Sequence, residues 1–181
     1  MANKRIFLIG YMGSGKTTVG KLLASNLNLE FIDLDGFIEG RYRKKIAQIF
    51  EEKGESGFRL IEHNALKEVS SLENIILATG GGTPCFYNNL EIMNKSGLTI
   101  YLKFSTEELS NRLFRCTHRP LIQNKSLAEL KIFIAQNIQQ RTSFYEGAQE
   151  ILDAEEMLAD SKVSTIVSGL TQSLQEKGGQ L

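Results

Sequence analysis

The sequence predicts an α/β fold in which helices flank a parallel sheet, and three observations support this prediction. Short apolar runs of strand length alternate along the chain with longer segments of helical periodicity. The first run, residues 6–9, leads through a glycine-rich turn into a helical segment. Acidic residues and glycines follow the second and third runs, where an open parallel sheet gathers its ligands. A chain of 181 residues suits one core with at most a small insertion, so we expect a single domain over residues 1–181.

The turn after the first strand has the spacing of a phosphate-binding loop. Gly10, Gly15, Lys16 and Thr17 match the pattern G-x-x-x-x-G-K-[ST]. Glycines allow positive φ, so backbone N–H groups can line a concave nest at the start of a helix. Lys16 can place its charge on the β- and γ-phosphates, and the Thr17 hydroxyl can bind the accompanying Mg²⁺. A plain glycine turn is the alternative, but the strand before it and the helix expected over residues 16–27 favour a nucleotide site.

A second strand, residues 29–32, leads into Asp33-Leu34-Asp35. If Leu34 turns into the core, strand alternation places both carboxylates on one face near the phosphate loop. One carboxylate could then serve Mg²⁺ and the other a substrate hydroxyl, although Asp35 could instead cap the next helix.

Residues 33–36 also fit the D-x-x-G pattern of GTPases. Only sixteen residues separate Lys16 from Asp33, too few for the effector loop and extra strand of a GTPase. The guanine-reading N-K-x-D is missing, because Leu127 stands at the aspartate position of the one similar segment. A GTPase is therefore a weak alternative.

Residues 37–72 follow a helical, strongly charged pattern that Gly54 interrupts. The block is long for a plain crossover between strands, so we expect a substrate-binding subdomain at about residues 35–62. Arg59 lies among apolar neighbours, where it either reaches water or is held inward by a carboxylate. His63 has no Cys or His partner nearby in the sequence, and we interpret it as structural.

The third strand, residues 74–79, runs into three consecutive glycines, residues 80–82. Without β-carbons, their backbone can approach a ligand and donate N–H groups to it, while a flexible turn is the alternative. A fourth strand is expected at residues 99–104, followed by a helix that begins at Ser105.

That helix carries Arg112 and breaks at Arg119-Pro120. The basic stretch at about residues 112–126 suits a lid, from which Arg119 could neutralise charge on a transferred phosphoryl group. An apolar stripe over residues 126–145 predicts a core-facing helix. We expect a weak fifth strand at residues 150–153 and a closing helix at residues 163–174.

Composition argues against several classes of partner. Lys+Arg and Asp+Glu both number 21, so no overall charge favours nucleic acid or an anionic membrane. No apolar stretch approaches the length of a membrane span, and the N-terminus leaves no room for a signal peptide before the first strand. Cys85 and Cys116 match no metal spacing and suit a reducing compartment. We therefore expect a cytoplasmic protein, and a monomer, without nucleic-acid or membrane partners.

In their order and separations, these motifs resemble the shikimate kinase family of adenylate-kinase-like P-loop phosphotransferases. The resemblance is carried by Gly10 to Thr18, Asp33 to Asp35, Phe58-Arg59, Gly80 to Gly82, Arg119-Pro120-Leu121 and the segment from Arg141 to Tyr145. It implies a three-layer P-loop kinase fold with a five-stranded parallel sheet in the order 2-3-1-4-5. It also implies phosphorylation of the 3-hydroxyl of shikimate by ATP, on the route to chorismate and the aromatic amino acids.

The resemblance further implies roles for individual residues. The ATP phosphates are held by Gly13, Ser14, Gly15, Lys16, Thr17 and Thr18. Thr17 binds Mg²⁺ directly and Asp33 binds it through water. Asp35 binds the shikimate hydroxyls and is the residue that comes nearest to the role of a general base. Arg59 and Arg141 clamp the shikimate carboxylate, and Gly81 adds a backbone N–H. Arg119 contacts the phosphates from the lid, and Arg112 aligns with a nucleotide-side position.

One segment departs from the family pattern. Where many members place an arginine beside adenine, residues 153–156 read Asp-Ala-Glu-Glu, so adenine must pack differently here. Two other functions stay open at this point: another small-metabolite kinase of similar fold, such as a gluconate kinase, and a nucleotide-binding module without catalysis.

Overall fold

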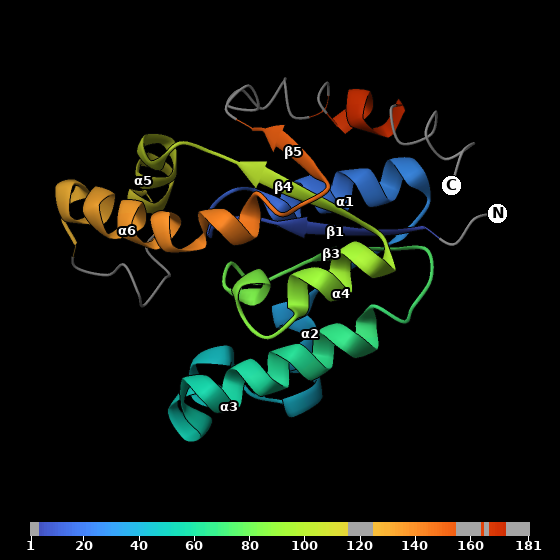
Figure 1. Cartoon of the computed structure of the whole chain (residues 1–181), viewed down its shortest axis with the longest axis horizontal. Helices are drawn as coiled ribbons and strands as arrows, with labels where there is room; N and C mark the ends of the chain where they lie inside the picture. The colour runs from blue at the N-terminus through green and yellow to red at the C-terminus, as the bar shows by residue number, and fades with distance from the viewer. Residues whose placement is uncertain (1–3, 116–124, 155–163, 165–166, 173–181) are drawn as a thin grey trace.

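The computed structural model describes residues 4–115, 125–154, 164 and 167–172. Its strands form one parallel sheet in the order β2-β3-β1-β4-β5, which confirms the α/β class and the strand order expected from the resemblance (Figure 1). The strands are β1 (Arg5–Ile9), β2 (Glu30–Asp33), β3 (Ile75–Ala78), β4 (Leu98–Lys103) and β5 (Glu150–Asp153).

The helices cover both faces of the sheet (Figure 1). They are α1 (Lys16–Leu27), α2 (Leu34–Tyr42), α3 (Ile46–Val69), α4 (Asn89–Ser96), α5 (Thr106–Phe114) and α6 (Leu127–Tyr145), with a short 3₁₀ turn, η1 (Thr83–Cys85). Residue 164 and residues 167–172 are helical, in agreement with the expected closing helix as far as it is described. Neither η1 nor α4 was predicted, because elements of three and eight residues are too short to show a helical period.

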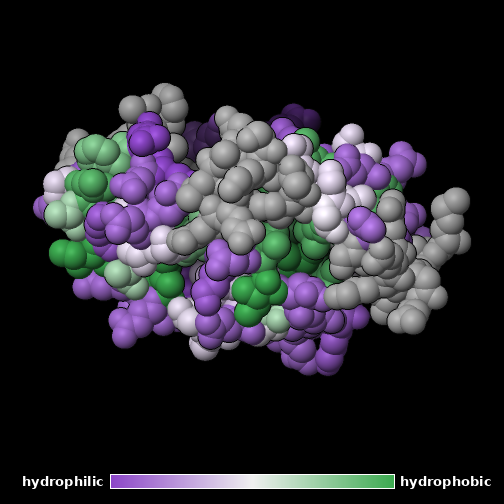
Figure 2. All heavy atoms as spheres, turned by 90° about the horizontal axis from the view of Figure 1, so that it is seen from above, coloured by the Kyte–Doolittle hydropathy of each residue, from purple (hydrophilic) through white to green (hydrophobic). Residues whose placement is uncertain are grey.

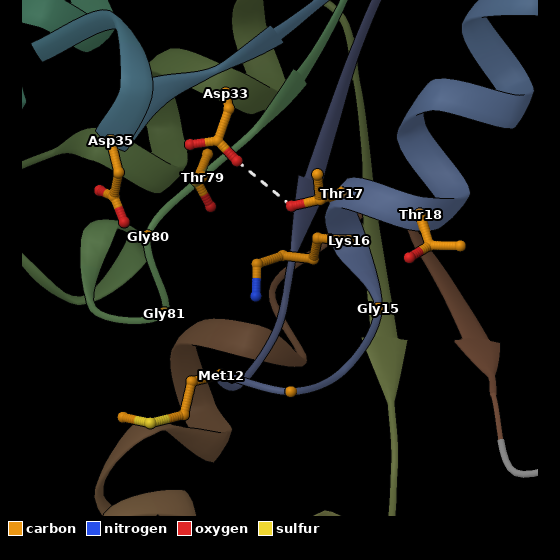
Figure 3. Close-up of a pocket in the computed structure, with 11 residues that line it drawn as sticks. Met12, Gly15, Lys16, Thr17, Thr18, Asp33, Asp35, Thr79, Gly80 and Gly81 are labelled. Atoms are coloured by element: carbon orange, nitrogen blue, oxygen red, sulfur yellow. Dashed lines mark hydrogen bonds between the residues drawn. The ribbon is translucent and has the colours of Figure 1, made fainter. Parts of the chain in front are cut away.

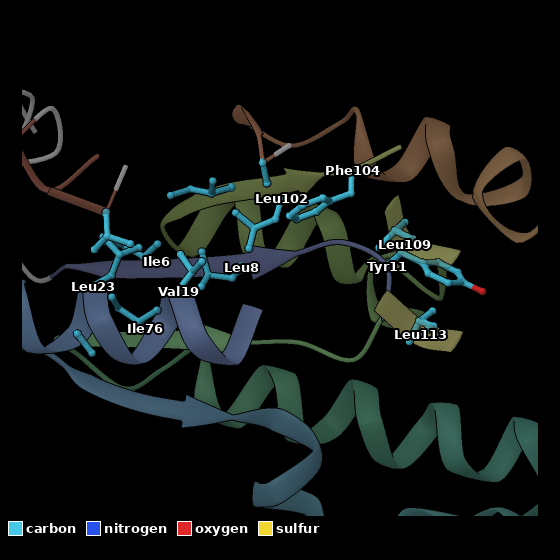
Figure 4. Packing of buried hydrophobic residues seen from close by; sticks show 14 of the residues in the cluster. Ile6, Leu8, Tyr11, Val19, Leu23, Ile76, Leu102, Phe104, Leu109 and Leu113 are labelled. Atoms are coloured by element: carbon cyan, nitrogen blue, oxygen red, sulfur yellow. The ribbon is translucent and has the colours of Figure 1, made fainter. Parts of the chain in front are cut away.

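Strand β1 lies at the centre of the sheet and is buried on both faces. Ile6 and Leu8 face the cluster that includes the apolar side of α1 (Figure 4). Phe7 and Ile9 face the cluster that includes α3. Burial on both faces explains why the strand is a continuous apolar run instead of an alternating one. The expected break in the charged helical block is also present, because Gly54 has φ 65° and ψ 179° inside α3.

The sheet order decides where the site forms. The arrows of β1, β4 and β5 in Figure 1 point toward the end of the molecule at which α5 and α6 lie, and β2 and β3 run parallel to them. Because β2, β3 and β1 are neighbours, the segments that follow them lie next to one another: Asp33 onward, Gly80 onward and Gly10 onward. Ligands of an open parallel sheet bind at this carboxyl edge.

The surface is mixed in character. On the face seen from above, hydrophilic residues and smaller apolar areas interleave among the coloured residues (Figure 2). In the part of the chain that the structure describes, no helix combines the length and the apolar character needed to span a bilayer.

Candidate active site

A cavity of about 350 Å³ opens at the carboxyl edge of the sheet. Its lining comes from the three adjacent strand ends: Met12, Gly13, Gly15, Lys16, Thr17, Thr18, Asp33, Asp35, Thr79, Gly80 and Gly81. Figure 3 shows the glycine-rich loop and the start of α1 on one side, with Asp35 and the Gly80–Gly81 backbone across from Lys16. Most residues expected at a nucleotide site therefore share one cavity, although Ser14 lies buried beneath the loop.

The loop has the backbone conformation of an anion-binding nest. Gly13 and Gly15 have φ of 83° and 82°, the left-handed region that L side chains rarely adopt. Gly15 also occupies the N-cap position of α1 and offers no side chain to cap the first N–H groups of that helix. The N–H groups of the first helical turn and the positive end of the helix dipole favour a bound polyphosphate.

The Lys16 ammonium lies in the curve of the loop. Its Nζ donates to the backbone oxygens of Gly10 at 2.8 Å and Tyr11 at 2.9 Å. The residue is 9% exposed, so its charge is held close to the loop and partly out of water. A positive group in this place attracts phosphate oxygens more strongly than a solvated lysine does.

Thr17 and Asp33 bring a hydroxyl oxygen and a carboxylate oxygen together in the cavity. The Thr17 hydroxyl donates to Asp33 Oδ2 at 3.2 Å, drawn as the dashed line in Figure 3. Asp33 Oδ1 accepts from the backbone N–H of Gly36 at 3.1 Å, so Asp33 caps α2. Among the described residues no cluster of three or more His, Cys, Asp or Glu could hold a metal ion. The pair still fits Mg²⁺, which commonly takes one or two protein oxygens and completes its shell with phosphates and water.

The predicted geometry of Asp33 and Asp35 was wrong, although both line the cavity. Strand β2 ends at Asp33, and Asp35 lies in the first turn of α2, so strand alternation does not relate them. The N-terminus of α2 forms here because Asp33 supplies a capping oxygen and Leu34 is fully buried, as expected. The capping role considered for Asp35 belongs to Asp33, which leaves the Asp35 carboxylate facing the cavity.

Asp35 lies in a setting that disfavours its charge. Burial is the largest cause, and the nearby carboxylates of Asp33 and Glu62 add to it, while Lys16 partly offsets them. Together they raise the pKa of Asp35 from 3.8 to about 6. A carboxylate with this pKa is still ionised at neutral pH and is a better proton acceptor than an ordinary aspartate.

Arg59 and Arg141 come from different helices and meet the same glycine turn. A β-carbon built on Gly82 would lie 2.8 Å from Arg59 Nη2, and one on Gly81 would lie 3.7 Å from Arg141 Nη1. Both guanidinium groups therefore pack against consecutive glycines that have no side chain to exclude them. Neither arginine is among the residues that line the cavity. Gly81, which belongs to the glycine turn that both arginines contact, is one of the lining residues.

Glu62 is the principal site residue that sequence reasoning did not identify. Its side chain is 1% exposed and accepts from Arg59 Nη1 at 2.9 Å and from the Thr83 hydroxyl at 2.6 Å. The Arg59 guanidinium also stacks on Phe86, 4.1 Å from the ring centroid. The signal for Glu62 was present in the sequence, because a carboxylate three residues after an arginine shares its helix face.

Two expected residues remain, and the first of them, Arg112, is not among the residues that line the cavity. Arg112 on α5 pairs with Glu108 at 2.8 Å and stacks on the Phe104 ring at 4.2 Å from its centroid. Arg119 and most of the expected lid, residues 116–124, lie outside the described residues. Met12, Thr79 and Gly80 also line the cavity, and the sequence analysis gave none of them a specific contact.

Comparison with known proteins gives one consistent family. The family model described as shikimate kinase matches residues 12–171. A shikimate kinase of Parabacteroides distasonis is 53% identical over 94% of this chain and 99% of its own length. The crystal structure of a Bacteroides thetaiotaomicron shikimate kinase has a TM-score of 0.92 at 45% identity, covering 96% of this chain and 99% of that one. A shikimate kinase from Acinetobacter baumannii in complex with shikimate has a TM-score of 0.85 at 32% identity, covering 97% and 95% of the two chains.

Proposed function

The chain belongs to the shikimate kinase family, and from this membership we propose how its own residues bind substrate and transfer the phosphoryl group. The enzyme transfers the γ-phosphoryl group of ATP to the 3-hydroxyl of shikimate, giving shikimate 3-phosphate and ADP, in the biosynthesis of chorismate and the aromatic amino acids. The observation that carries the proposed mechanism is the convergence of three adjacent strand ends, which bring a phosphate nest, Asp35 and an arginine-flanked glycine turn to one place.

The phosphate nest is proposed to hold the triphosphate of ATP. Backbone N–H groups of residues 13–18 donate to its oxygens, and Lys16 contributes the positive charge. Thr17 is proposed to bind Mg²⁺ directly and Asp33 through water, in keeping with their 3.2 Å hydrogen bond. When bound, this ion neutralises charge between the phosphates. Arg112 and Arg119 are proposed to act on the nucleotide side, the latter from the lid, on the basis of the resemblance alone.

Asp35 is proposed as the general base. Its carboxylate faces the cavity and has a pKa of about 6, so it can accept a hydrogen bond from the 3-hydroxyl and take its proton as the phosphoryl group arrives. Arg59, Arg141 and the Gly81 N–H are proposed to bind the shikimate carboxylate. Charge-assisted pairs of this kind orient a ring as well as bind it, which fixes the hydroxyl that faces Asp35.

The experiment couples ADP release to shikimate addition with the purified protein. Arg59→Ala and Arg141→Ala should each raise the shikimate KM about 10–100-fold, since a hydrogen bond to a charged group contributes about 1.5–3 kcal/mol. The ATP KM should change little. Exposed Lys53 on α3 offers a control, Lys53→Ala, for which both constants should stay at their wild-type values. An equal shikimate KM in the wild type and in all three variants would contradict the proposal that the two arginines bind the shikimate carboxylate.

The same assay separates the two remaining alternatives. Gluconate in place of shikimate should give no ADP release above background. Asp35→Asn should lower kcat by about 100-fold or more, as expected for loss of a general base, whereas a non-catalytic module would show no change.

We also propose that the enzyme works as a monomer in the cytoplasm. Cys85 is a free thiol, which suits a reducing compartment. Light scattering at assay concentration tests the first proposal, and cell fractionation tests the second.

A further inference from the structure

A chain of hydrogen bonds leads from the Arg59 guanidinium to a histidine outside the cavity. Arg59 donates to Glu62 at 2.9 Å, and Glu62 accepts from the Thr83 hydroxyl at 2.6 Å. The Thr83 backbone oxygen accepts from Asn89 Nδ2 at 2.8 Å, and Asn89 Oδ1 lies 2.6 Å from Nδ1 of His63. The chain therefore begins and ends on α3, and its middle lies in η1 and at the start of α4.

The middle of this chain is sealed from water. Thr83 and Asn89 are 0% exposed and Glu62 is 1% exposed, so each polar group depends on the partner that the protein supplies. Helices α3 and α4 pack side by side, which keeps His63 over Asn89 (Figure 1). His63 itself is partly buried, and its ring lies 4.8 Å from that of Tyr87.

The pattern of donors and acceptors determines the proton position on His63. Asn89 uses its Nδ2 group as the donor to Thr83, so the Oδ1 atom that faces His63 can only accept. Nδ1 of His63 must therefore carry a hydrogen. Without that donor, Oδ1 would be a buried acceptor with no partner, and the Asn89 amide would lose the contact that sets its orientation.

Thr83 is held from two sides as a result. Its hydroxyl is bound by Glu62 and its carbonyl by Asn89, and these two groups flank the turn that follows Gly81 and Gly82. The Gly82 backbone lies against the Arg59 guanidinium, so any displacement of this turn displaces the arginine or its carboxylate partner.

We propose that His63 is a positioning residue for the carboxylate end of the substrate site. Its Nδ1–H orients Asn89, Asn89 holds the Thr83 turn, and the turn with Glu62 keeps the Arg59 guanidinium where a carboxylate can meet it. This inference rests on the proposed function of Arg59. It replaces the purely structural interpretation of His63, because the effect is expected on substrate affinity and not only on stability.

The test compares three variants in the full-length enzyme. His63→Leu removes the donor and should raise the shikimate KM about 5–20-fold, with kcat and the ATP KM within about twofold of wild type. His63→Asn restores an N–H near the Nδ1 position and should return the shikimate KM to within about threefold of wild type. Val69→Ala makes a cavity elsewhere in α3 and should lower the melting temperature without raising that KM. A wild-type KM in His63→Leu, or an equal rise in Val69→Ala, would overturn the proposal.

Measurements in a second enzyme variant, Arg59→Ala, separate this inference from the proposed function on which it rests. In an Arg59→Ala enzyme, His63→Leu should cause no further rise in the shikimate KM, since the two residues act on one contact. A further rise of the same size would show that His63 acts by another route and would overturn the inference alone. If Arg59→Ala itself leaves the KM unchanged, the proposed carboxylate clamp fails, and this inference fails with it.

Discussion

Replacing Asp35 with asparagine should lower kcat by about 100-fold or more and yet make the ligand-free protein more stable. The carboxylate is held partly out of water beside Asp33 and Glu62, and these surroundings raise its pKa to about 6. A raised pKa means that the folded state binds the proton more tightly than the unfolded state does. Stability contributed by this group is therefore fully present below pH 3.8 and is lost as the pH rises toward 6.

The size of the effect follows from the two pKa values. The difference between 3.8 and about 6 corresponds to about 3 kcal/mol at neutral pH, taking about 1.4 kcal/mol for each pKa unit. Asparagine has nearly the same shape as aspartate and no charge, but burying its amide group still has an unfavourable free energy. We expect a gain of about 1–3 kcal/mol, or roughly 3–8 °C in melting temperature for a chain of this length.

Thermal unfolding of the ligand-free proteins at pH 7.5 and pH 5 measures this gain. At pH 5 most of the folded wild type carries a proton on Asp35, so the advantage of Asp35→Asn should shrink to about half. Glu51→Gln, which neutralises an exposed carboxylate on α3, is the charge control and should stay within about 0.5 kcal/mol of wild type. An Asp35→Asn protein no more stable than wild type at pH 7.5, or equally stabilised at both pH values, would refute the reasoning.

Four other measurements test the geometry of the fold and the site. For wild type, kcat/KM for shikimate should fall about tenfold per pH unit below pH 6 as the base is protonated, and a flat profile to pH 5 would exclude this carboxylate as the base. Gly20→Ala puts a methyl group 2.4 Å from Phe31 Cε2, so urea unfolding should show a loss of about 1–3 kcal/mol with both KM values unchanged. Undiminished stability would contradict the close packing of α1 on β2. Thr17→Val removes the hydroxyl that we propose binds Mg²⁺ and should raise the Mg²⁺ concentration for half-maximal activity about tenfold. An unchanged Mg²⁺ dependence would exclude Thr17 as a ligand. Gly82→Ala places a β-carbon within 3.0 Å of three Arg59 guanidinium atoms, so the shikimate KM should rise about tenfold while the ATP KM stays constant. A wild-type shikimate KM would mean that Arg59 is free to move aside.

The local features of this protein were predictable from the sequence. The first strand, the glycine-rich loop and the start of α1 at Lys16 appear where the pattern places them, because loop spacing and apolar runs act over a few residues. Four strand positions were within a residue of the structure and the fifth agreed with it, and Gly54 interrupts α3 as expected. The strand order came from the family resemblance, and no single strand segment would have predicted it.

Tertiary structure decided how the side chains are used. Arg59 and Arg141 are far apart in the chain, and they approach one glycine turn only because β3 lies between β1 and β2. Asp35 owes its raised pKa first to burial and then to the carboxylates of Asp33 and Glu62, and the burial and the nearness of Glu62 depend on how α2 and α3 pack together.

The set of chemical groups and the local shape of the phosphate nest could therefore be predicted from the amino-acid sequence, since both depend on neighbours along the chain. Which groups face one another, and how strongly each is charged, depends on the packing of segments that are distant in the chain. The contact between His63 and Asn89 depends on the packing of α3 against α4. Burial changes the pKa of a side chain because the elements packed around it exclude water.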